Sequence, residues 1–380
     1  MVLGLGLTTG CDAFDFGRLN RASGAAASAS GSAGLAPSSQ PPPVASRADR
    51  LVVVAGGDVA LGGAVRSWIG ADPKYDPLAG VRAVIEDDAF EIVSLVAPLT
   101  ARAAPVGKGG FAPGPPAGAA ALARARVSLV AVTDPHLWAS GRLAFEDTIH
   151  ELAGAGVAHA GASVGPGEVS ALTERQVLGW SVAVLTVGEW PAGSSPEGKG
   201  HVALAEKASL VERIRAVRAR HDLVLVSHGG GTDQGDAPAP ATVDLARAAM
   251  EAGADAFVGH RGATPLGVGW VSGRPIFYGL GNLVMDEDPK VPWTGRGLLA
   301  RIVFGKRGER EVSVCPVILG DGEPKLLTGS NRPTQEGIFA RAISRLSEPL
   351  GGVDVSDPDA HSCMRLTPPR QPVTDSSAPR

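Results

Sequence analysis

LVVVAGGD, residues 51–58, combines a continuous apolar run with a Gly-Gly-Asp ending. Such a run is typical of a strand that is buried on both faces, as in a sheet with parallel strands. Because the segment ends in small residues and a carboxylate, we expect the chain to turn there and to present an acidic group. Similar apolar runs follow at residues 91–96, 127–132, 181–187, 222–226, 256–258 and 275–278.

Patterns typical of helices lie between several of these runs, at residues 116–126, 142–155, 203–220 and 239–252. Strands that alternate with helices form βαβ units. We therefore predict an α/β fold, with a layered sheet inside and helices on the outside. Two later runs, 298–304 and 311–319, have no helix between them and predict an antiparallel hairpin, and residues 333–347 predict a closing helix.

The composition excludes several classes of protein. The chain has 380 residues, of which 35 are Lys or Arg and 39 are Asp or Glu, so its net charge is −4. With no basic block and only 4% aromatic residues, nucleic acid is not an expected partner. No apolar run approaches the length of about 18–20 residues that a membrane-spanning helix needs. The three cysteines exclude a disulfide framework or a zinc ribbon, and Cys315 is expected to be a small buried hydrophobe.

The two ends of the chain differ from the middle. Residues 1–11, MVLGLGLTTGC, resemble a bacterial lipoprotein signal whose Cys11 becomes lipidated, although the basic n-region is missing; an ordinary tail with a chance cysteine is the alternative. Residues 12–49 are rich in Ala, Ser, Gly and Pro and predict a flexible tether. Residues 50–350 then form the globular domain, and 351–380 a disordered tail. This order predicts a cell-envelope protein, either lipid-anchored or secreted.

Chemistry-bearing side chains follow four of the apolar runs. In open α/β sheets, sites form beyond the carboxyl ends of the strands. Any one of these residues is more often a turn residue or a satisfied polar group, but all four positions together predict a site. Carboxylate and imidazole are the ligands of Zn, Mn or Fe. The residues are Asp58, Asp134 with His136, His228 and His260.

The order of these residues resembles the dinuclear metallophosphatases, and more specifically the CapA family of bacterial capsule synthesis proteins, which act in poly-γ-glutamate biosynthesis. The resemblance covers residues 50–350 and implies a metallo-dependent phosphatase-like fold. Its most specific block is GRPIFYGLGNL, residues 273–283. The other matching segments are residues 53–62, 94–100, 130–136, 155–162 and 252–260.

Departures from the family pattern bear on the mechanism. The glutamate expected between two metals is Val96, and the last histidine of the Gly-His-His-Pro-His segment is Ala263. The resemblance then leaves Asp58 as a lone ligand of one metal. It implies that Asp134, His228 and His260 hold at most one divalent ion (Mn, Fe or Zn), with His136 as the general acid. Arg261 either replaces the lost charge beside the substrate or is a solvated loop residue, and Asn282 either orients a ligand or is a turn residue.

These observations leave three functions open. The first is a CapA-like surface protein in capsule, exopolysaccharide or poly-γ-glutamate assembly, with a degenerate one-metal or metal-free site. The second is an active one-metal hydrolase or phosphoesterase of the same fold. The third is an extracellular polymer-binding module without catalysis. Each of these functions predicts an anionic polymer or capsule precursor as partner. The first also predicts contact with membrane-anchored capsule machinery. Whether the chain is an enzyme stays open.

Overall fold

The computed structural model describes residues 49–102, 106, 110–164, 169, 171–189, 202–231, 235–286 and 293–369. All of them belong to one compact unit, Ala45–Arg380. The expected signal with Cys11, and all but the last residue of the expected tether, lie outside the described residues. In the described ranges, no helix is long and apolar enough to cross a membrane.

Two sheets form the centre of the described structure, one of ten strands and one of six. The larger sheet has the order β15 (Asp354–Val355), β16 (Met364–Thr367), β13 (Arg310–Gly320), β12 (Arg296–Gly305), β1 (Arg50–Val59), β2 (Phe90–Leu95), β3 (Leu129–Ala131) and β4 (His159–Ala160), with β11 (Asn282–Val284) beside β1 and β14 (Glu323–Leu326) beside β13. The smaller sheet has the order β5 (Leu172–Val177), β6 (Trp180–Gly188), β7 (Leu223–Gly229), β8 (Ala256–His260), β10 (Arg274–Phe277) and β9 (Val268–Val271).

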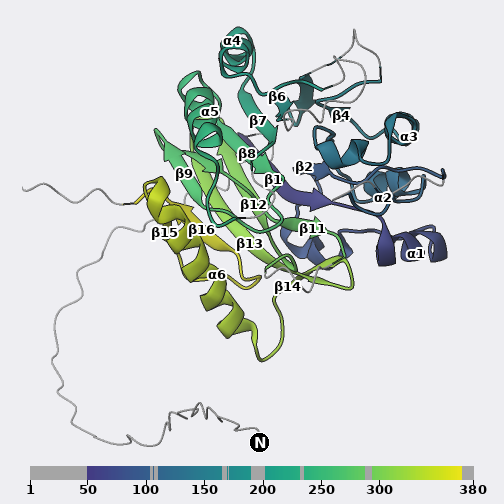
Figure 1. Ribbon diagram of the computed structural model, residues 1–380. Coiled ribbons are helices and arrows are strands. Elements are labelled where there is room, and N and C mark those ends of the chain that lie inside the picture. The colour runs from purple at the N-terminus through teal and green to yellow at the C-terminus, as the bar shows by residue number, and fades with distance from the viewer. Residues whose placement is uncertain are drawn as a thin grey trace, which may run out of the picture. The chain divides into compact units, whose positions relative to one another are not determined.

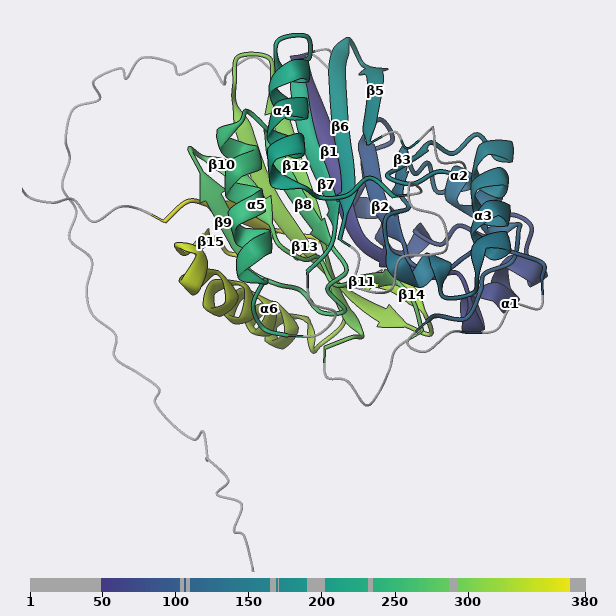
Figure 2. The same ribbon diagram turned by 45° about the horizontal axis from the view of Figure 1, so that its top comes forward.

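Helices cover the outer faces of both sheets (Figures 1 and 2). The helices α1 (Gly63–Ala71), α2 (Gly118–Arg124) and α3 (Arg142–Gly154) pack on the larger sheet, and α4 (Lys207–Arg218) and α5 (Pro240–Glu251) pack on the smaller one. A last helix, α6 (Arg332–Ser347), sends Phe339 and Ile343 into the core between the sheets. The predicted α/β class with helices outside a layered sheet is therefore confirmed.

The continuous apolar runs follow from this layering. Along β1, Leu51 and Val53 face the core between the two sheets, whereas Val52 and Val54 face the core beneath α1–α3. Because both faces of the strand are covered, successive residues are apolar and do not alternate with polar ones. The predicted hairpin is also present, since β12 and β13 pair in antiparallel fashion from Arg296–Ile318 to Phe304–Arg310.

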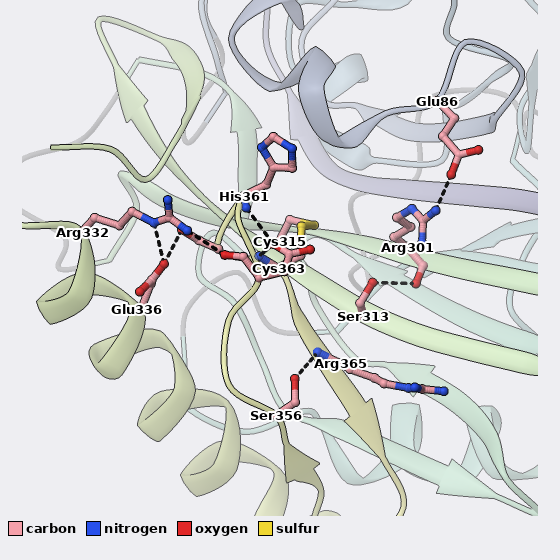
Figure 3. The surroundings of a disulfide bond; sticks show 12 residues. Glu86, Arg301, Ser313, Cys315, Arg332, Glu336, Ser356, His361, Cys363 and Arg365 are labelled. Atoms are coloured by element: carbon pink, nitrogen blue, oxygen red, sulfur yellow. Dashed lines mark hydrogen bonds and ion pairs between the residues drawn. A yellow bond between two sulfur atoms is a disulfide. The ribbon is translucent and has the colours of Figure 1, made fainter. Parts of the chain in front are cut away.

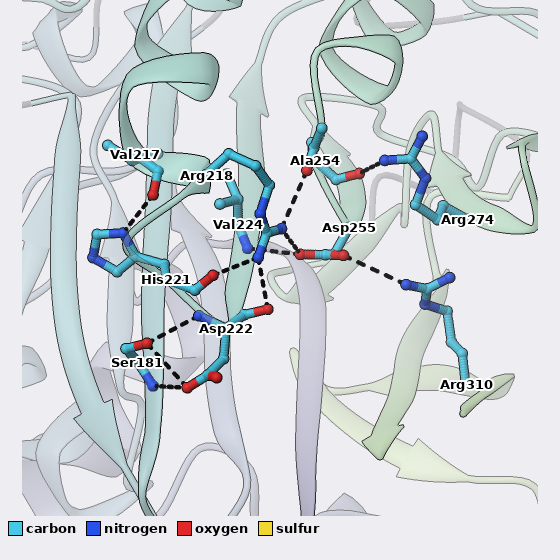
Figure 4. A network of polar contacts seen from close by, with 11 residues as sticks. Ser181, Val217, Arg218, His221, Asp222, Val224, Ala254, Asp255, Arg274 and Arg310 are labelled. Atoms are coloured by element: carbon cyan, nitrogen blue, oxygen red, sulfur yellow. Dashed lines mark hydrogen bonds and ion pairs between the residues drawn. The ribbon is translucent and has the colours of Figure 1, made fainter. Parts of the chain in front are cut away.

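A polar network fastens the two sheets at the amino ends of β7 and β8 (Figure 4). Arg218 of α4 donates to the carboxylate of Asp255 and to the carbonyl oxygens of His221 and Asp222. Arg310 of β13 brings Nη2 within 3.5 Å of Asp255 Oδ1, which links the larger sheet to the smaller one. The network therefore fixes the end of the sheets that is opposite to the predicted site.

Two features of the C-terminal region differ from expectation. The tail of residues 351–380 was expected to be disordered, but its described part, 351–369, contains β15 and β16, and β16 pairs with β13 and buries Met364 and Leu366 between the sheets. Residues 370–380 lie outside the described residues. Cys315 is fully buried as expected, but it forms a disulfide bond with Cys363 (Figure 3). The alternation of apolar and polar residues in Met364–Thr367 is the strand signal that the polar, Pro-rich surroundings obscured.

Candidate functional site

The predicted site residues lie on two stacked sheets and not at the strand ends of a single sheet. Asp58 belongs to β1, and Asp134 follows β3, in the larger sheet. His228 belongs to β7 and His260 ends β8, in the smaller sheet. The periodicity of each strand gave no information on which sheet it joins, because both sheets are covered on both faces.

The carboxyl ends of the two sheets nevertheless meet. The side chain of Thr133, just past β3, fills the space beside two glycines: a Cβ atom on Gly188 would lie 2.7 Å from Thr133 Cβ, and one on Gly229 would lie 2.1 Å from Thr133 Oγ1. The N–H of Arg261, just past β8, donates to Asp58 Oδ1 of the larger sheet at 3.2 Å. Glycines at these positions therefore allow the backbone of one sheet to approach the other.

Asp134 and His136 form a hydrogen-bonded pair. Asp134 is the N-cap of a short 3₁₀ helix, Pro135–Trp138, and its Oδ1 accepts from the N–H of His136 at 2.7 Å. The same oxygen lies 2.8 Å from His136 Nδ1. The ring of His136 also packs edge-on against Phe111, with ring centroids 5.2 Å apart. Since Asp134 is completely buried and His136 is not, the carboxylate orients an imidazole that reaches the surface.

His228 lies beside a carboxylate, which the sequence analysis missed. Its Nε2 lies 3.2 Å from Oε1 of Glu189, the residue that follows β6. The proximity of His228 lowers the pKa of Glu189 below its usual value, and a hydrogen bond from the N–H of Gly231 acts in the same direction. Glu189 follows an apolar run, as the predicted residues do, so the same rule would have found it.

His260 is buried and bonded to a neighbour on β7. Its Nε2 lies 3.0 Å from Ser227 Oγ, and both side chains are almost fully inaccessible to solvent. Burial lowers the pKa of His260 to about 3, and the nearby His228 acts in the same direction. His260 is therefore a neutral imidazole at physiological pH.

Arg261 and Asn282 are both neighbours of Asp58. Arg261 adopts a φ of 71°, which is uncommon for a residue other than glycine and is often found at functional sites. Asn282 stands opposite Asp58 in the β1–β11 pairing. Its Nδ2 donates to the carbonyl oxygen of Thr294 at 3.0 Å, so the amide holds a neighbouring loop.

The side chains as placed do not fit the predicted three-ligand metal ion. In the described part of the chain, no group of three or more His, Cys, Asp or Glu side chains is arranged to hold one. Instead, Asp134, His228 and His260 each have a separate neighbour in the protein. Val96, where the family pattern has a glutamate, packs in a small apolar cluster with Ala60, Ala97, Met285 and Leu319.

Residues 52–287 match the family model described as bacterial capsule synthesis protein PGA_cap. The chain belongs to this family. The match covers more than half of the chain and confirms the resemblance that the sequence motifs indicated.

Three curated relatives are similar to parts of the chain. A probable polyglutamine synthesis accessory protein of Mycobacterium tuberculosis is 30% identical over 181 residues, 44% of this chain and 48% of the relative. The capsule biosynthesis protein CapA of Bacillus anthracis is 27% identical over 218 residues, 55% of this chain and 52% of the relative. The PGA biosynthesis protein CapA of Bacillus subtilis is 29% identical over 122 residues, 32% and 31% of the two chains. The chain thus spans about half the length, or less, of these relatives.

Two solved structures have a distant likeness to the chain. A 5′-nucleotidase precursor from Thermus thermophilus is 14% identical with a TM-score of 0.42, covering 79% of this chain and 59% of the other. A putative 5′-nucleotidase from Staphylococcus aureus is 12% identical with a TM-score of 0.43, covering 82% and 62%. Similarity at this level supports no argument about activity.

Proposed function

We propose that the chain is a cell-envelope protein that assembles a capsule polymer of the poly-γ-glutamate type, and that the site at the carboxyl ends of its two sheets acts without a dinuclear metal centre. The observation that carries this proposal is the family match over residues 52–287. Asp134, His228 and His260 each lie beside a different side chain of the same protein, which supports the absence of a dinuclear metal centre from this proposal.

In this proposal, Asp134 and His136 perform the proton transfer. Because Asp134 Oδ1 lies beside His136 Nδ1, the carboxylate favours the imidazole form with its proton on Nδ1. Nε2 is then the nitrogen through which His136 exchanges a proton with a bound polymer or precursor. Arg261, at the end of β8, supplies positive charge for an anionic ligand.

The Cys315–Cys363 disulfide supports a location outside the cytoplasm, since disulfides persist in oxidising compartments. Lipidation of Cys11 remains part of the proposal, with the tether of residues 12–49 placing the domain away from the membrane. The expected partners are an anionic polymer or capsule precursor and membrane-anchored capsule machinery, and nucleic acid is not among them.

A one-metal hydrolase or phosphoesterase is the second candidate. One observation favours it: Asp134 Oδ2, His260 Nδ1 and both ring nitrogens of His228 are buried without a hydrogen bond of good geometry. Buried polar atoms are normally satisfied, so an ion or water at this place would account for them. Elemental analysis of protein purified without a His tag distinguishes the candidates, because the second requires about one divalent ion (Mn, Fe or Zn) per chain.

Genetic complementation tests the first candidate. The gene is deleted in the bacterium that encodes it, and surface polymer is measured after the wild-type chain or His136→Ala is supplied. Restoration by the wild type alone is the expected result. Full restoration by His136→Ala would favour a polymer-binding module without catalysis.

A further inference from the structure

A cleft lies beside the Cys315–Cys363 disulfide, and none of the candidate site residues lines it. Its cavity volume is about 460 Å³, and its walls come from β12, β13, the 3₁₀ helix η2 (Ala79–Val84) and the segment that leads into β16. Cys363 lines the cleft and is 9% exposed, whereas Cys315 is completely buried and does not line it. A small molecule in the cleft therefore meets the sulfur of Cys363 first.

The backbone holds Cys363 in place independently of the disulfide. Asp359 Oδ1 accepts from the N–H of Cys363 at 2.9 Å and from the N–H of His361 at 2.8 Å. The N–H of Asp359 donates in turn to the carbonyl oxygen of Cys363 at 2.9 Å. Arg332 of α6 donates to the carbonyl oxygen of Asp359 at 2.7 Å, which ties this turn to the helix. Cys363 therefore keeps its position when its bond to Cys315 opens.

Two arginines and a serine form a row next to the disulfide (Figure 3). Ser313 of β13 stands opposite Arg301 of β12 and also opposite Arg365 of β16. Directly opposite residues share a face of the sheet, so the three side chains lie on one face. Cys315 is two residues further along β13, on the same face and roughly 7 Å away along the strand. Two guanidinium groups thus lie within reach of a small molecule whose sulfur is at the disulfide.

The cleft carries charges of both signs. Glu86 is contacted by the guanidinium groups of both Arg50 and Arg301, so this group of three has a surplus positive charge. In the described part of the chain, some exposed charged side chains of the lining have neither a hydrogen-bond nor an ion-pair partner; these are Arg365, Glu311 and Asp357. A ligand with one carboxylate and one ammonium group therefore finds an opposite charge for each.

We propose that Cys363 is a thiol-exchange site and that the cleft admits a small zwitterionic thiol, which carries both an ammonium and a carboxylate group. The thiolate attacks Cys363 Sγ, the bond to Cys315 breaks, and its electron pair leaves with Cys315 Sγ, which takes a proton from water. The products are a mixed disulfide at Cys363 and a thiol at Cys315. A second thiolate then attacks the bound sulfur of the first, which leaves as a symmetric disulfide, and Cys363 becomes a thiol.

The structure makes this exchange asymmetric. Rates of exchange depend on access to the attacked sulfur, and of the two cysteines only Cys363 borders the cleft. Cys315 lies in the same buried apolar cluster as Leu299 and Val317. The incoming thiol is therefore expected on Cys363 and not on Cys315. Because the disulfide links β13 to the C-terminal strand, exchange makes the stability of the domain depend on the thiols around it.

The test treats the folded full chain, as the Cys11→Ala variant, with glutathione, cysteine or 2-mercaptoethanol. The first two probes are zwitterionic and the third is neutral. Mass spectrometry of alkylated peptides locates the adduct, and each rate constant is divided by that of the same thiol with the urea-denatured chain, which corrects for intrinsic reactivity. The adduct is expected on Cys363, with a corrected rate roughly tenfold higher for the zwitterionic thiols at low salt. An adduct on Cys315, or equal corrected rates, would overturn the proposal.

One variant and a matched control test the role of the cleft charges. Arg365→Gln is expected to lower the preference for zwitterionic thiols several-fold and to leave the rate with 2-mercaptoethanol unchanged. Arg215→Gln is the control, because Arg215 is an exposed arginine of α4 without a side-chain partner in the described ranges. The control should leave every rate unchanged. A full preference in Arg365→Gln would contradict recognition by the cleft.

The dependence on urea distinguishes exchange in the folded protein from exchange during transient unfolding. In the folded protein, the rate of adduct formation rises in proportion to the thiol concentration and does not respond to low concentrations of urea. Exchange through unfolding accelerates with urea, because urea raises the population of the open form. We expect the first behaviour, and acceleration by urea below the unfolding transition would overturn the assignment of Cys363 as an exchange site of the native fold.

Discussion

Removal of the Cys315–Cys363 disulfide should destabilise the domain substantially. The bond joins Cys315 of β13 to Cys363, the residue just before β16, and closes a loop with a sequence separation of 48 residues. For a loop of this size, the loss of chain entropy in the unfolded state corresponds to about 4 kcal/mol at 25 °C. With an unfolding entropy of roughly 2.1 cal/mol/K per residue, a domain of about 320 residues should then melt about 6 °C lower.

The assay compares three forms of the full chain by thermal and urea unfolding. The first is the oxidised wild type, the second is the wild type reduced with a dithiol, which keeps both side chains, and the third is Cys315→Ala/Cys363→Ala. Cys11→Ala is the matched control and should leave the melting temperature unchanged. In Cys11→Ala, thiol titration of the denatured, unreduced chain is expected to find no free cysteine. Two free thiols in that variant, or equal stability of the oxidised and reduced forms of the wild type, would refute the reasoning.

Three other predictions concern groups away from this bond. Burial raises the pKa of Glu91 to about 7, so the folded protein binds a proton at Glu91 more tightly than the unfolded chain does. Protonated Glu91 should therefore contribute roughly 2–4 kcal/mol to the free energy of unfolding below about pH 4.5, and this contribution should be lost as the pH rises through about 7. Glu91→Gln should abolish that pH dependence in urea unfolding at pH 5 and pH 8. Val96→Glu places a carboxylate in an apolar cluster and, without a metal, should lower the free energy of unfolding by about 2–4 kcal/mol. When Ala263→His is added to this variant, elemental analysis should still find fewer than two ions per chain, and two tightly held ions would show that the ligands are misassigned. Cys11 should incorporate a palmitate analogue when the gene is expressed in its own bacterium, and label that persists in Cys11→Ala would exclude lipidation there.

The sequence predicted most of the secondary structure because the strands are continuous apolar runs. The expected helix at residues 333–347 agrees closely with α6, Arg332–Ser347. The sequence could not predict the division into two sheets, because a strand covered on both faces has the same apolar pattern in either sheet. It also missed the disulfide, since Cys363 lies in a polar segment whose pairing with β13 depends on residues about 50 positions apart.

For the candidate site, the sequence predicted positions better than contacts. Each of Asp58, Asp134, His228 and His260 is at or just past the carboxyl end of a strand, as the apolar runs implied. Whether Asp134 of the larger sheet can share an ion with His228 and His260 of the smaller sheet depends on the distance between the two sheets, and no local pattern encodes that distance. Sequence alone therefore suggested a shared metal ion, whereas the structure pairs Asp134 with His136 and His228 with Glu189.

The most direct test of the central proposal is the amount of surface polymer in a deletion strain of the encoding bacterium, measured with and without the gene. The polymer is released from washed cells, hydrolysed and quantified, and the strain is complemented with the wild-type chain or with His136→Ala at equal protein level. We predict that deletion removes most of the polymer, that the wild type restores it, and that His136→Ala restores little. Unchanged polymer after deletion would contradict the proposed role in capsule assembly.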